Sequence, residues 1–173
     1  LKIIHGGIRY LQEFDLLRLR QSVKERRTLL RIAPHLIHPL HCMMPTYGHG
    51  LKSRAALCCG ILANSILSWD RNRGLPPDKH IGTGRVGSRA EWVRMAPDIA
   101  DPRYTGVAFW EDACAYNTER LGTAFLKAAT QAGAEAANHL EVIGFRRNGR
   151  AVTGVTAVDR VTGKTFTLAA KCM

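Results

Sequence analysis

The sequence lacks any apolar run long enough to cross a membrane. Its longest apolar stretch, residues 55–67, is interrupted by Asn64 and Ser65 and falls short of the roughly 20 residues that a bilayer requires. No signal peptide, internal repeat or low-complexity segment is recognisable. A length of 173 residues and a hydrophobic fraction of 46% favour a globular protein with a substantial core.

The sequence also lacks a cysteine framework. Its five cysteines are odd in number and none of them forms a C-x-x-C pair, which argues against disulfides and against a zinc site. The pattern predicts reduced, mostly buried thiols in a cytosolic protein. The cysteines are Cys42, Cys58, Cys59, Cys114 and Cys172.

Two motif-like patterns are weak. His35, His38 and His41 recur every third residue, but on a strand this spacing turns successive side chains to opposite faces, so no metal site is expected. Residues 82–87 (GTGRVG) match the letters of a dinucleotide-binding fingerprint. No strand-like run precedes them, so we expect a loop there.

Acidic residues are few, with 14 Asp and Glu against 25 Lys and Arg, giving a net charge of +11. No nucleic-acid reader motif accompanies this charge, so a nucleic-acid partner is not expected. Much of the charge recurs at helical spacing, opposite Leu16, Leu19, Val23 and Leu30. This basic face is either a solvated helix surface or a contact for anionic lipid headgroups, and it comprises Arg20, Lys24, Arg27 and Arg31.

Hydrophobic periodicity predicts an α+β fold. Asp15 is expected to cap a helix that Pro34 ends, and Asn148-Gly149 predicts a hairpin turn. Helices are predicted over residues 7–14, 15–32, 52–69, 88–95 and 117–132. Strands are predicted over residues 36–47, at an edge, over 104–115, at the centre of a sheet, and over 139–147, 151–159 and 164–170, as a meander.

The first ten residues, LKIIHGGIRY, carry the strongest functional signal. Gly6 and Gly7 would let the backbone approach a planar ligand closely, although an ordinary turn also accounts for the pair. Three potential ligand groups, on His5, Arg9 and Tyr10, flank the glycines. An imidazole exchanges a proton near neutral pH, and a guanidinium meets a phosphate bidentately.

With the segment up to residue 36, which ends in A-P-H-L, these residues resemble the FAD-dependent glycerol-3-phosphate dehydrogenases of the D-amino-acid-oxidase-like flavoprotein superfamily. In that family a segment of the type S-K-L-I-H-G-G-L-R-Y-L passes close to the flavin and the substrate. The resemblance spans nearly the whole chain. It is specific over residues 1–34 and 117–132 and loose over 47–102.

The resemblance implies part of a FAD-dependent oxidoreductase fold, with helices, antiparallel substrate-side strands and a β-meander. It divides the chain into a flavin- and substrate-proximal helical segment (1–34), a substrate-side region (35–115) and a helix with the meander of the FAD domain (116–173). The dinucleotide-binding unit would lie upstream, so we expect an internal fragment that is incomplete without it.

The resemblance also assigns roles to residues. His5 would be the catalytic proton acceptor or a positioning histidine, and Arg9 and Tyr10 would bind the substrate. Val142 would offer backbone to the adenine. The other contacts to the FAD cofactor would come from Lys2, Ile3, Ile4, Gly6 and Gly7.

The implied reaction is oxidation of sn-glycerol 3-phosphate, a small phosphorylated polyol, to dihydroxyacetone phosphate. Hydride would go to flavin and electrons to quinone, in a cytoplasmic enzyme with possible peripheral contact to the inner face of the membrane. One departure leaves the substrate open, because Ala115–Leu121 reads AYNTERL where the family reads V-D-D-A-R-L. A related oxidoreductase for another hydroxy or amino substrate, or a non-catalytic basic module that binds membrane or nucleic acid, stays an alternative.

Overall fold

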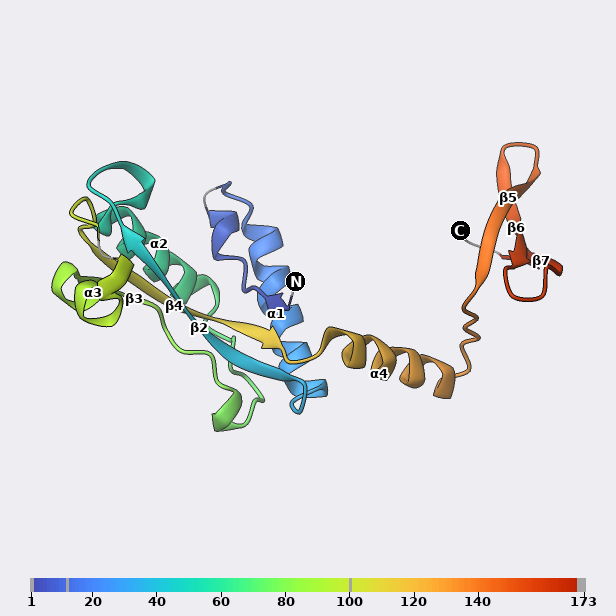
Figure 1. The fold of residues 1–173 in the computed structure, drawn as a ribbon, viewed down its shortest axis with the longest axis horizontal. Coiled ribbons are helices and arrows are strands. Elements are labelled where there is room, and N and C mark those ends of the chain that lie inside the picture. The colour runs from blue at the N-terminus through green and yellow to red at the C-terminus, as the bar shows by residue number, and fades with distance from the viewer. Residues whose placement is uncertain (1, 12, 100, 171–173) are drawn as a thin grey trace. The chain divides into compact units, whose positions relative to one another are not determined.

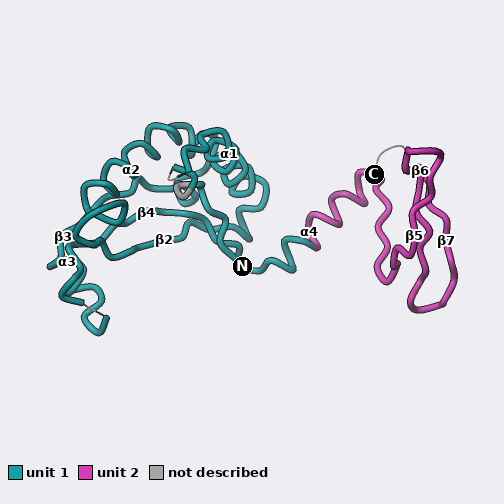
Figure 2. The backbone as a smooth tube through the Cα atoms, turned by 90° about the horizontal axis from the view of Figure 1, so that it is seen from above, with its two compact units in different colours: residues 1–122 teal, residues 123–173 magenta. Residues whose placement is uncertain are grey.

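The computed structural model describes residues 2–11, 13–99 and 101–170, with the side chains of Ile8 and Arg9 outside the description. Its contacts divide the chain into two compact units, Leu1–Gly122 and Thr123–Met173, coloured separately in Figure 2. The predicted division by role at residues 34 and 115 concerns function and stays a prediction.

Unit 1 is built on a four-stranded antiparallel sheet. The central strand β4 (Gly106–Ala115) pairs along its whole length with β2 (Ile37–Thr46), as Figure 1 shows. Its other edge pairs with β1 (Ile3–Ile4) near one end and with β3 (Arg85–Ser88) near the other. The predicted central and edge positions of the two long strands are confirmed.

The edge of β4 that carries β1 and β3 has a gap. β3 pairs up to Phe109 and β1 begins at Ala113, so Trp110, Glu111 and Asp112 have no strand partner on that edge among the described residues. Backbone groups exposed in such a gap need other partners. One chamber of the candidate functional site extends over this gap.

The α-helices follow the predicted ranges closely. Their N-terminal N–H groups are satisfied by side-chain caps, as short polar residues at these positions predict. Asp15, Ser53, Ser88 and Asn117 each accept a backbone N–H three residues on. The helices are α1 (Leu16–Ile32), α2 (Arg54–Leu67), α3 (Arg89–Met95) and α4 (Thr118–Gln131).

The core of unit 1 lies between α1 and the sheet. In Figure 2, α1 and α2 lie along the same face of β2 and β4. Leu19, Val23 and Leu30 form a fully buried stripe on α1, whereas Leu16, expected on that face, is 45% exposed. The helix therefore buries one apolar stripe, which begins at Leu19.

The N-terminal helix expected over residues 7–14 is wrong. Only a single 3-10 turn forms there, η1 (Ile8–Leu11). Gly7 precedes it at φ +83° and Phe14 follows it at φ +54°, and left-handed residues end a right-handed helix. Further 3-10 turns are η2 (Gly50–Lys52), η3 (Pro77–Lys79) and η4 (Pro97–Ile99).

The loop expected over residues 82–87 is wrong in its second half, because Arg85–Ser88 forms β3. Gly106 faces this strand on β4, and a Cβ there would overlap the carbonyl oxygen of Gly87. Glycine at this position lets a short strand approach where the sequence pattern shows no β run. The residues preceding β3, Ile81–Gly84, are irregular, as expected.

Unit 2 contains the predicted meander, with β6 (Ala151–Asp159) between β5 (Leu140–Asn148) and β7 (Thr165–Ala169). The first hairpin forms where expected, but its turn residues are Gly149 and Arg150, since Asn148 pairs with Ala151 in the ladder. Gly149 has φ +58° and Arg150 has no positive φ, as in a turn with glycine at its first central position.

The cysteines differ from the expectation. Among the described cysteines, Cys58 and Cys59 are exposed and Cys42 and Cys114 are half-buried, so the prediction of mostly buried thiols is wrong for this part of the chain. Cys172 lies outside the described residues. In the described residues, no group of histidine, cysteine and acidic side chains is arranged to hold a metal ion, and no helix has the length and apolarity to cross a membrane.

Candidate functional site

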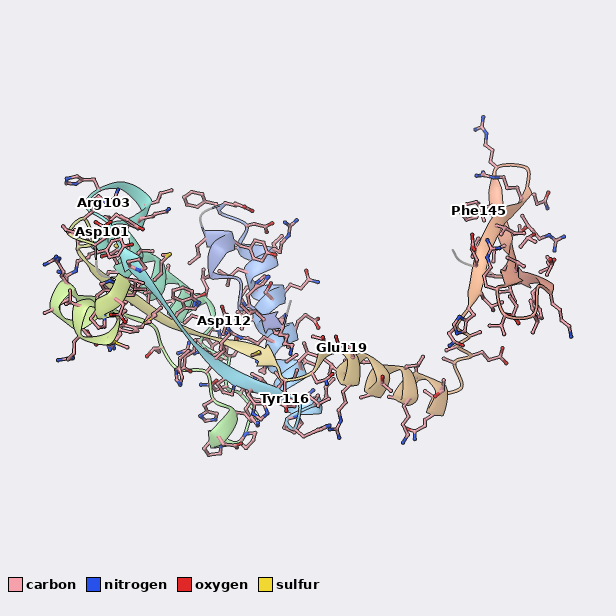
Figure 3. The ribbon with its side chains drawn as sticks, in the orientation of Figure 1. Asp101, Arg103, Asp112, Tyr116, Glu119 and Phe145 are labelled. Carbon is pink, nitrogen blue, oxygen red and sulfur yellow. The ribbon has the colours of Figure 1, made fainter. Side chains whose placement is uncertain are left out.

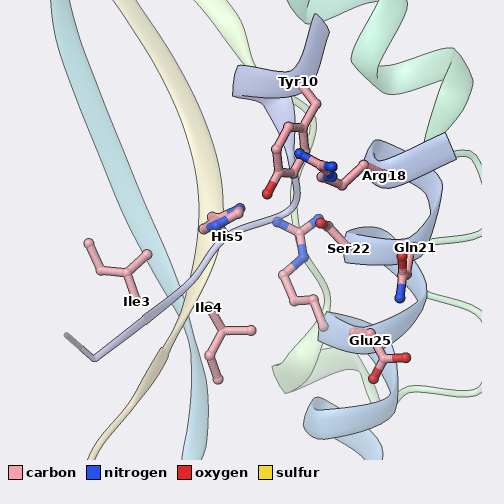
Figure 4. A pocket seen from close by; sticks show the side chains of 9 residues that line it. Ile3, Ile4, His5, Tyr10, Arg18, Gln21, Ser22 and Glu25 are labelled. Atoms are coloured by element: carbon pink, nitrogen blue, oxygen red, sulfur yellow. The ribbon is translucent and has the colours of Figure 1, made fainter. Parts of the chain in front are cut away.

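A pocket opens beside β1, where the N-terminal segment passes α1 (Figure 4). Its volume is about 500 Å³. Figure 4 shows the side chains of His5, Tyr10 and Arg18 close to one another in its lining. The lining residues are Ile3, Ile4, His5, Tyr10, Arg18, Gln21, Ser22, Glu25 and Arg26.

A second chamber of about 610 Å³ shares Ile3, His5, Tyr10 and Arg18 with the first. It extends over the gap in β4 to Trp110 and Asp112 and is also lined by Glu13. The two chambers therefore form one continuous cleft. The protein brings His5 and Tyr10 together in this cleft, and their catalytic and substrate-binding roles stay predictions.

Three polar side chains of the cleft lie next to one another in the order His5, Tyr10 and Arg18. The rings of His5 and Tyr10 have centroids 5.9 Å apart, and the Arg18 guanidinium lies 5.5 Å from the centroid of the Tyr10 ring. Arg18 also pairs with Asp15 at 3.3 Å. An imidazole, a phenol and a cation thus share one open pocket, which suits an anionic, hydroxyl-bearing ligand.

The two glycines have packing reasons of their own. A Cβ on Gly6 would overlap the guanidinium of Arg26, and Gly7 is buried at φ +83° against Leu19 of α1. The pair therefore lets the N-terminal segment lie directly on α1. The prediction that Gly6 and Gly7 contact flavin stays untested.

Asp112 connects β4 to the glycine segment. Its Oδ1 accepts the backbone N–H of Gly6 at 2.6 Å and Nη1 of Arg26 at 2.8 Å, and its Oδ2 accepts Nε1 of Trp110 at 3.1 Å. Figure 3 labels Asp112 on β4. Asp112 is 6% exposed and Arg26 3%. Burial lowers the pKa of Arg26, and the charge of Asp112 opposes this shift.

The edge of β1 offers backbone groups to a ligand. Ala115 donates its N–H to the carbonyl of Lys2, so antiparallel alternation directs the N–H and C=O of Ile3 away from β4. An extended edge that turns backbone groups outward beside apolar side chains fits the polar rim and flat face of a flavin ring.

Three further residues were predicted to contact cofactor or substrate. Lys2 is exposed, and its Nζ lies 3.5 Å from the carbonyl oxygen of Tyr116. The side chain of Arg9 lies outside the described part of the chain. Val142 lies in β5 of unit 2, half-exposed, beside an irregularity in the pairing with β6. The roles of all three stay predictions.

Sequence reasoning missed Arg18, Arg26 and Asp112. A signal existed for Arg26, which continues the helical stripe of Leu19, Val23 and Leu30 as a charged residue on the buried face. A charge in such a stripe requires a buried partner. Nothing in the sequence identified that partner as Asp112, because their contact spans 86 residues.

The basic face of α1 is only partly free. Arg20 and Arg27 both bind the carboxylate of Asp70, at 2.6 Å and 2.7 Å, and Arg27 also donates to the backbone carbonyl of Asp70 at 2.8 Å. Lys24 and Arg31 remain exposed. Two of the four cations of the expected basic face therefore bind α1 to the segment that follows α2.

Comparison with known proteins identifies the class. Residues 1–172 match the family model described as FAD dependent oxidoreductase, and the chain belongs to this family. FAD is the cofactor on which the family depends. The fold and the cleft at β1 are therefore part of a flavoprotein.

Curated relatives narrow the resemblance. The chain is 29% identical over 168 residues to a glycerol-3-phosphate dehydrogenase of Synechocystis, covering 96% of this chain and 29% of the relative. It is also 29% identical over 170 residues to an alpha-glycerophosphate oxidase of Lactococcus lactis, covering 98% of this chain and 27% of the relative. The chain thus spans less than a third of these relatives.

A solved structure agrees on the fold. The glycerol-3-phosphate dehydrogenase of Bacillus halodurans, complexed with FAD, matches with a TM-score of 0.60 and 20% sequence identity. The match covers 98% of this chain and 24% of that one. The predicted α+β arrangement, as part of a larger flavoprotein fold, is confirmed.

Proposed function

We propose that the protein containing this chain oxidises sn-glycerol 3-phosphate to dihydroxyacetone phosphate. The observation that carries the proposal is the cleft at β1, in which His5, Tyr10 and Arg18 meet the open edge of a strand. The family membership and the names of the relatives support the same activity. When bound, FAD would supply the hydride acceptor for the carbinol carbon.

His5 is the proposed proton acceptor. Oxidation of a secondary alcohol removes a hydride from C2 and a proton from the hydroxyl on the same carbon. The imidazole of His5 is exposed at the mouth of the cleft and stands next to Tyr10. It takes the hydroxyl proton, while Tyr10 donates a hydrogen bond that orients the substrate.

Arg9 and Tyr10 are the proposed contacts for the phosphate. Arg18 supplies a second cation, because its guanidinium lines both chambers of the cleft. A phosphate dianion gains most from charge-assisted hydrogen bonds. The cleft thereby distinguishes a phosphorylated polyol from free glycerol.

The FAD contacts extend the proposal along the chain. The backbone of Lys2, Ile3 and Ile4, followed by Gly6 and Gly7, would border the ring system. Val142 in β5 would offer backbone to the adenine. On this basis residues 1–34 form the flavin- and substrate-proximal segment, 35–115 the substrate-side region and 116–173 part of the FAD domain.

Quinone is the proposed electron acceptor, in a cytoplasmic enzyme that contacts the inner face of the membrane peripherally. The exposed Lys24 and Arg31 support contact with anionic headgroups. Both dehydrogenases and oxidases occur among the relatives, so the acceptor is tested separately. Turnover of the full-length protein with a quinone analogue should exceed turnover with oxygen alone.

The activity is tested with the full-length protein. We expect a yellow protein with a flavin spectrum that reduces a dye acceptor with sn-glycerol 3-phosphate and much more slowly with glycerol. His5→Gln should lower kcat by about 10²–10⁴-fold, the usual contribution of a positioned base. His49→Gln is the matched control, because His49 is exposed and lies outside the cleft.

The outcomes separate the alternatives. A flavoprotein that ignores sn-glycerol 3-phosphate but oxidises another hydroxy or amino compound would contradict the substrate while preserving the class. A colourless full-length protein that binds vesicles or nucleic acid would favour a non-catalytic basic module. If His5→Gln and His49→Gln lower kcat equally, His5 is not the proton acceptor.

A further inference from the structure

We infer that Arg26 and Asp112 are positioning residues that set the direction of the His5-Gly6 peptide at the mouth of the cleft. The inference rests on the proposed function of His5 and deepens it. The inference does not require either residue to contact the substrate. Their role would be to hold in place the segment that carries His5.

The first argument is the way in which β1 ends. If the pairing of Ile4 with Ala113 continued by two residues, the N–H of Gly6 would bind the carbonyl of Glu111. It binds Oδ1 of Asp112 at 2.6 Å instead, and the carbonyl of Glu111 accepts Nη1 of Arg26 at 3.2 Å. The two side chains therefore satisfy the N–H of Gly6 and the carbonyl of Glu111, which would bind each other in a longer strand.

The second argument is the peptide that this arrangement holds. The N–H of Gly6 belongs to the same planar unit as the carbonyl of His5, so the bond to Asp112 sets the orientation of that plane. On the other side, the N–H of Tyr10 bonds to the carbonyl of Gly7 at 2.8 Å. His5 and Tyr10 thus extend from a short segment anchored at Gly6.

The third argument is rigidity. Arg26 and Asp112 are both more than nine-tenths buried, and their ion pair measures 2.8 Å. Nε1 of Trp110 holds the second carboxylate oxygen. The guanidinium also lies directly on Gly6, where a Cβ would overlap it. A buried pair with these hydrogen bonds has one favourable geometry.

The fourth argument is position relative to the cleft. Asp112 lines one chamber and Arg26 lines the other, beside Ile3 and His5, which line both. The pair thus borders the cleft that the predicted reacting group also lines. A displacement of about 1 Å at such a site lowers a rate by about a hundredfold.

The experiment compares Asp112→Asn with Asp70→Asn in the full-length protein. Both variants remove a buried carboxylate charge that binds an arginine of α1. Only Asp112 reaches Gly6. Asp70→Asn is therefore the matched control for loss of an ion pair.

Two readouts are used. Hydrogen–deuterium exchange of the peptide that contains Gly6 is measured without substrate. We expect it to be faster in Asp112→Asn and unchanged in Asp70→Asn. With sn-glycerol 3-phosphate, kcat should fall about a hundredfold in Asp112→Asn, with a smaller change in KM, while Asp70→Asn keeps the wild-type kcat.

Arg26→Lys provides a second variant if Asp112→Asn fails to fold. Lysine keeps the charge beside Asp112 but lacks the planar guanidinium whose Nη1 donates both to Asp112 and to the carbonyl of Glu111, so we expect an intermediate loss of kcat and intermediate exchange. Exchange and kcat that match Asp70→Asn would overturn the inference. Absence of wild-type turnover would contradict the proposed function alone, since the exchange comparison needs no substrate.

Discussion

The carboxylate of Asp70 accepts two hydrogen bonds from the guanidinium of Arg20, at 2.6 Å and 3.1 Å. Asp70 lies just after α2, so this contact ties that segment to α1. The hydrogen bond from Arg20 is the largest cause that holds the pKa of Asp70 well below its usual range, and Arg27 adds to it. A buried, doubly paired carboxylate of this kind contributes to folding only while it is ionised.

The first prediction concerns Asp70→Asn and pH. The folded-state pKa of Asp70 is depressed, so its stabilisation is complete above the unfolded value of about 3.9 and disappears as pH falls through the folded value. We expect a loss of about 1.5–3 kcal/mol at pH 7 that shrinks below about pH 4. Urea unfolding of the full-length protein at several pH values measures it.

Asp98→Asn is the control, because Asp98 is exposed in the 3-10 turn η4. It should change the free energy of unfolding little at any pH. A penalty for Asp70→Asn that stayed constant down to pH 2 would show that charge is not the source of the stabilisation.

The second prediction concerns Gly6→Ala. The added methyl would overlap the guanidinium of Arg26, which is buried and paired, so we expect a loss of about 1–3 kcal/mol together with weaker activity. Gly60→Ala is the control in α2, where a Cβ meets nothing within 4 Å. Alanine there should be neutral or should stabilise the helix by about 1 kcal/mol. Equal melting temperatures for the two variants would contradict the close packing at Gly6.

The third prediction separates Arg9 from Arg18. Arg9→Ala should raise KM for sn-glycerol 3-phosphate about ten- to a hundredfold, because a hydrogen bond to a charged group contributes about 1.5–3 kcal/mol. Arg18→Met should raise KM less, since Arg18 is already paired with Asp15. Steady-state kinetics with a dye acceptor measures both. A larger effect of Arg18→Met would assign the phosphate contact to Arg18.

The fourth prediction concerns membrane contact. Reversing Lys24 and Arg31 to glutamate should release the full-length protein from vesicles that contain phosphatidylglycerol, because each cation near an anionic surface contributes about 1 kcal/mol. Turnover with a soluble dye should persist. Reversing Arg150 and Lys164 in unit 2 makes the same change in charge elsewhere. If vesicle binding depends neither on Lys24 and Arg31 nor on the salt concentration, the basic face of α1 is a solvated helix surface and not a membrane contact.

Much of the fold follows from local signals. The cap at Asp15, the alternation of the two long strands and the glycine of the first hairpin each determine a structure within a few residues. The same rules failed at η1, where positive φ angles at Gly7 and Phe14 limit the helix to one turn. They also failed at β3, which depends on pairing with a distant glycine, Gly106.

The candidate site was predictable only in part. His5, Arg9 and Tyr10 are close in sequence, so a pattern of ten residues could indicate them. Arg26 and Asp112 lie in a helix and a strand that look ordinary in isolation, and their meaning arises from a contact over 86 residues. A long-range contact also changes the expected basic face. Two of its four cations, Arg20 and Arg27, are paired with Asp70.

The contact between Gly6 and the Arg26 guanidinium has an evolutionary consequence. A side chain at position 6 requires a smaller residue at position 26, and this would leave the carboxylate at position 112 buried without a countercharge. A single substitution at any of the three positions should therefore lower the stability of the fold. The size of that loss depends on the residues at the other two positions. Positions 6, 26 and 112 should vary as a unit among descendants of this chain, with strong epistasis between changes far apart in the gene.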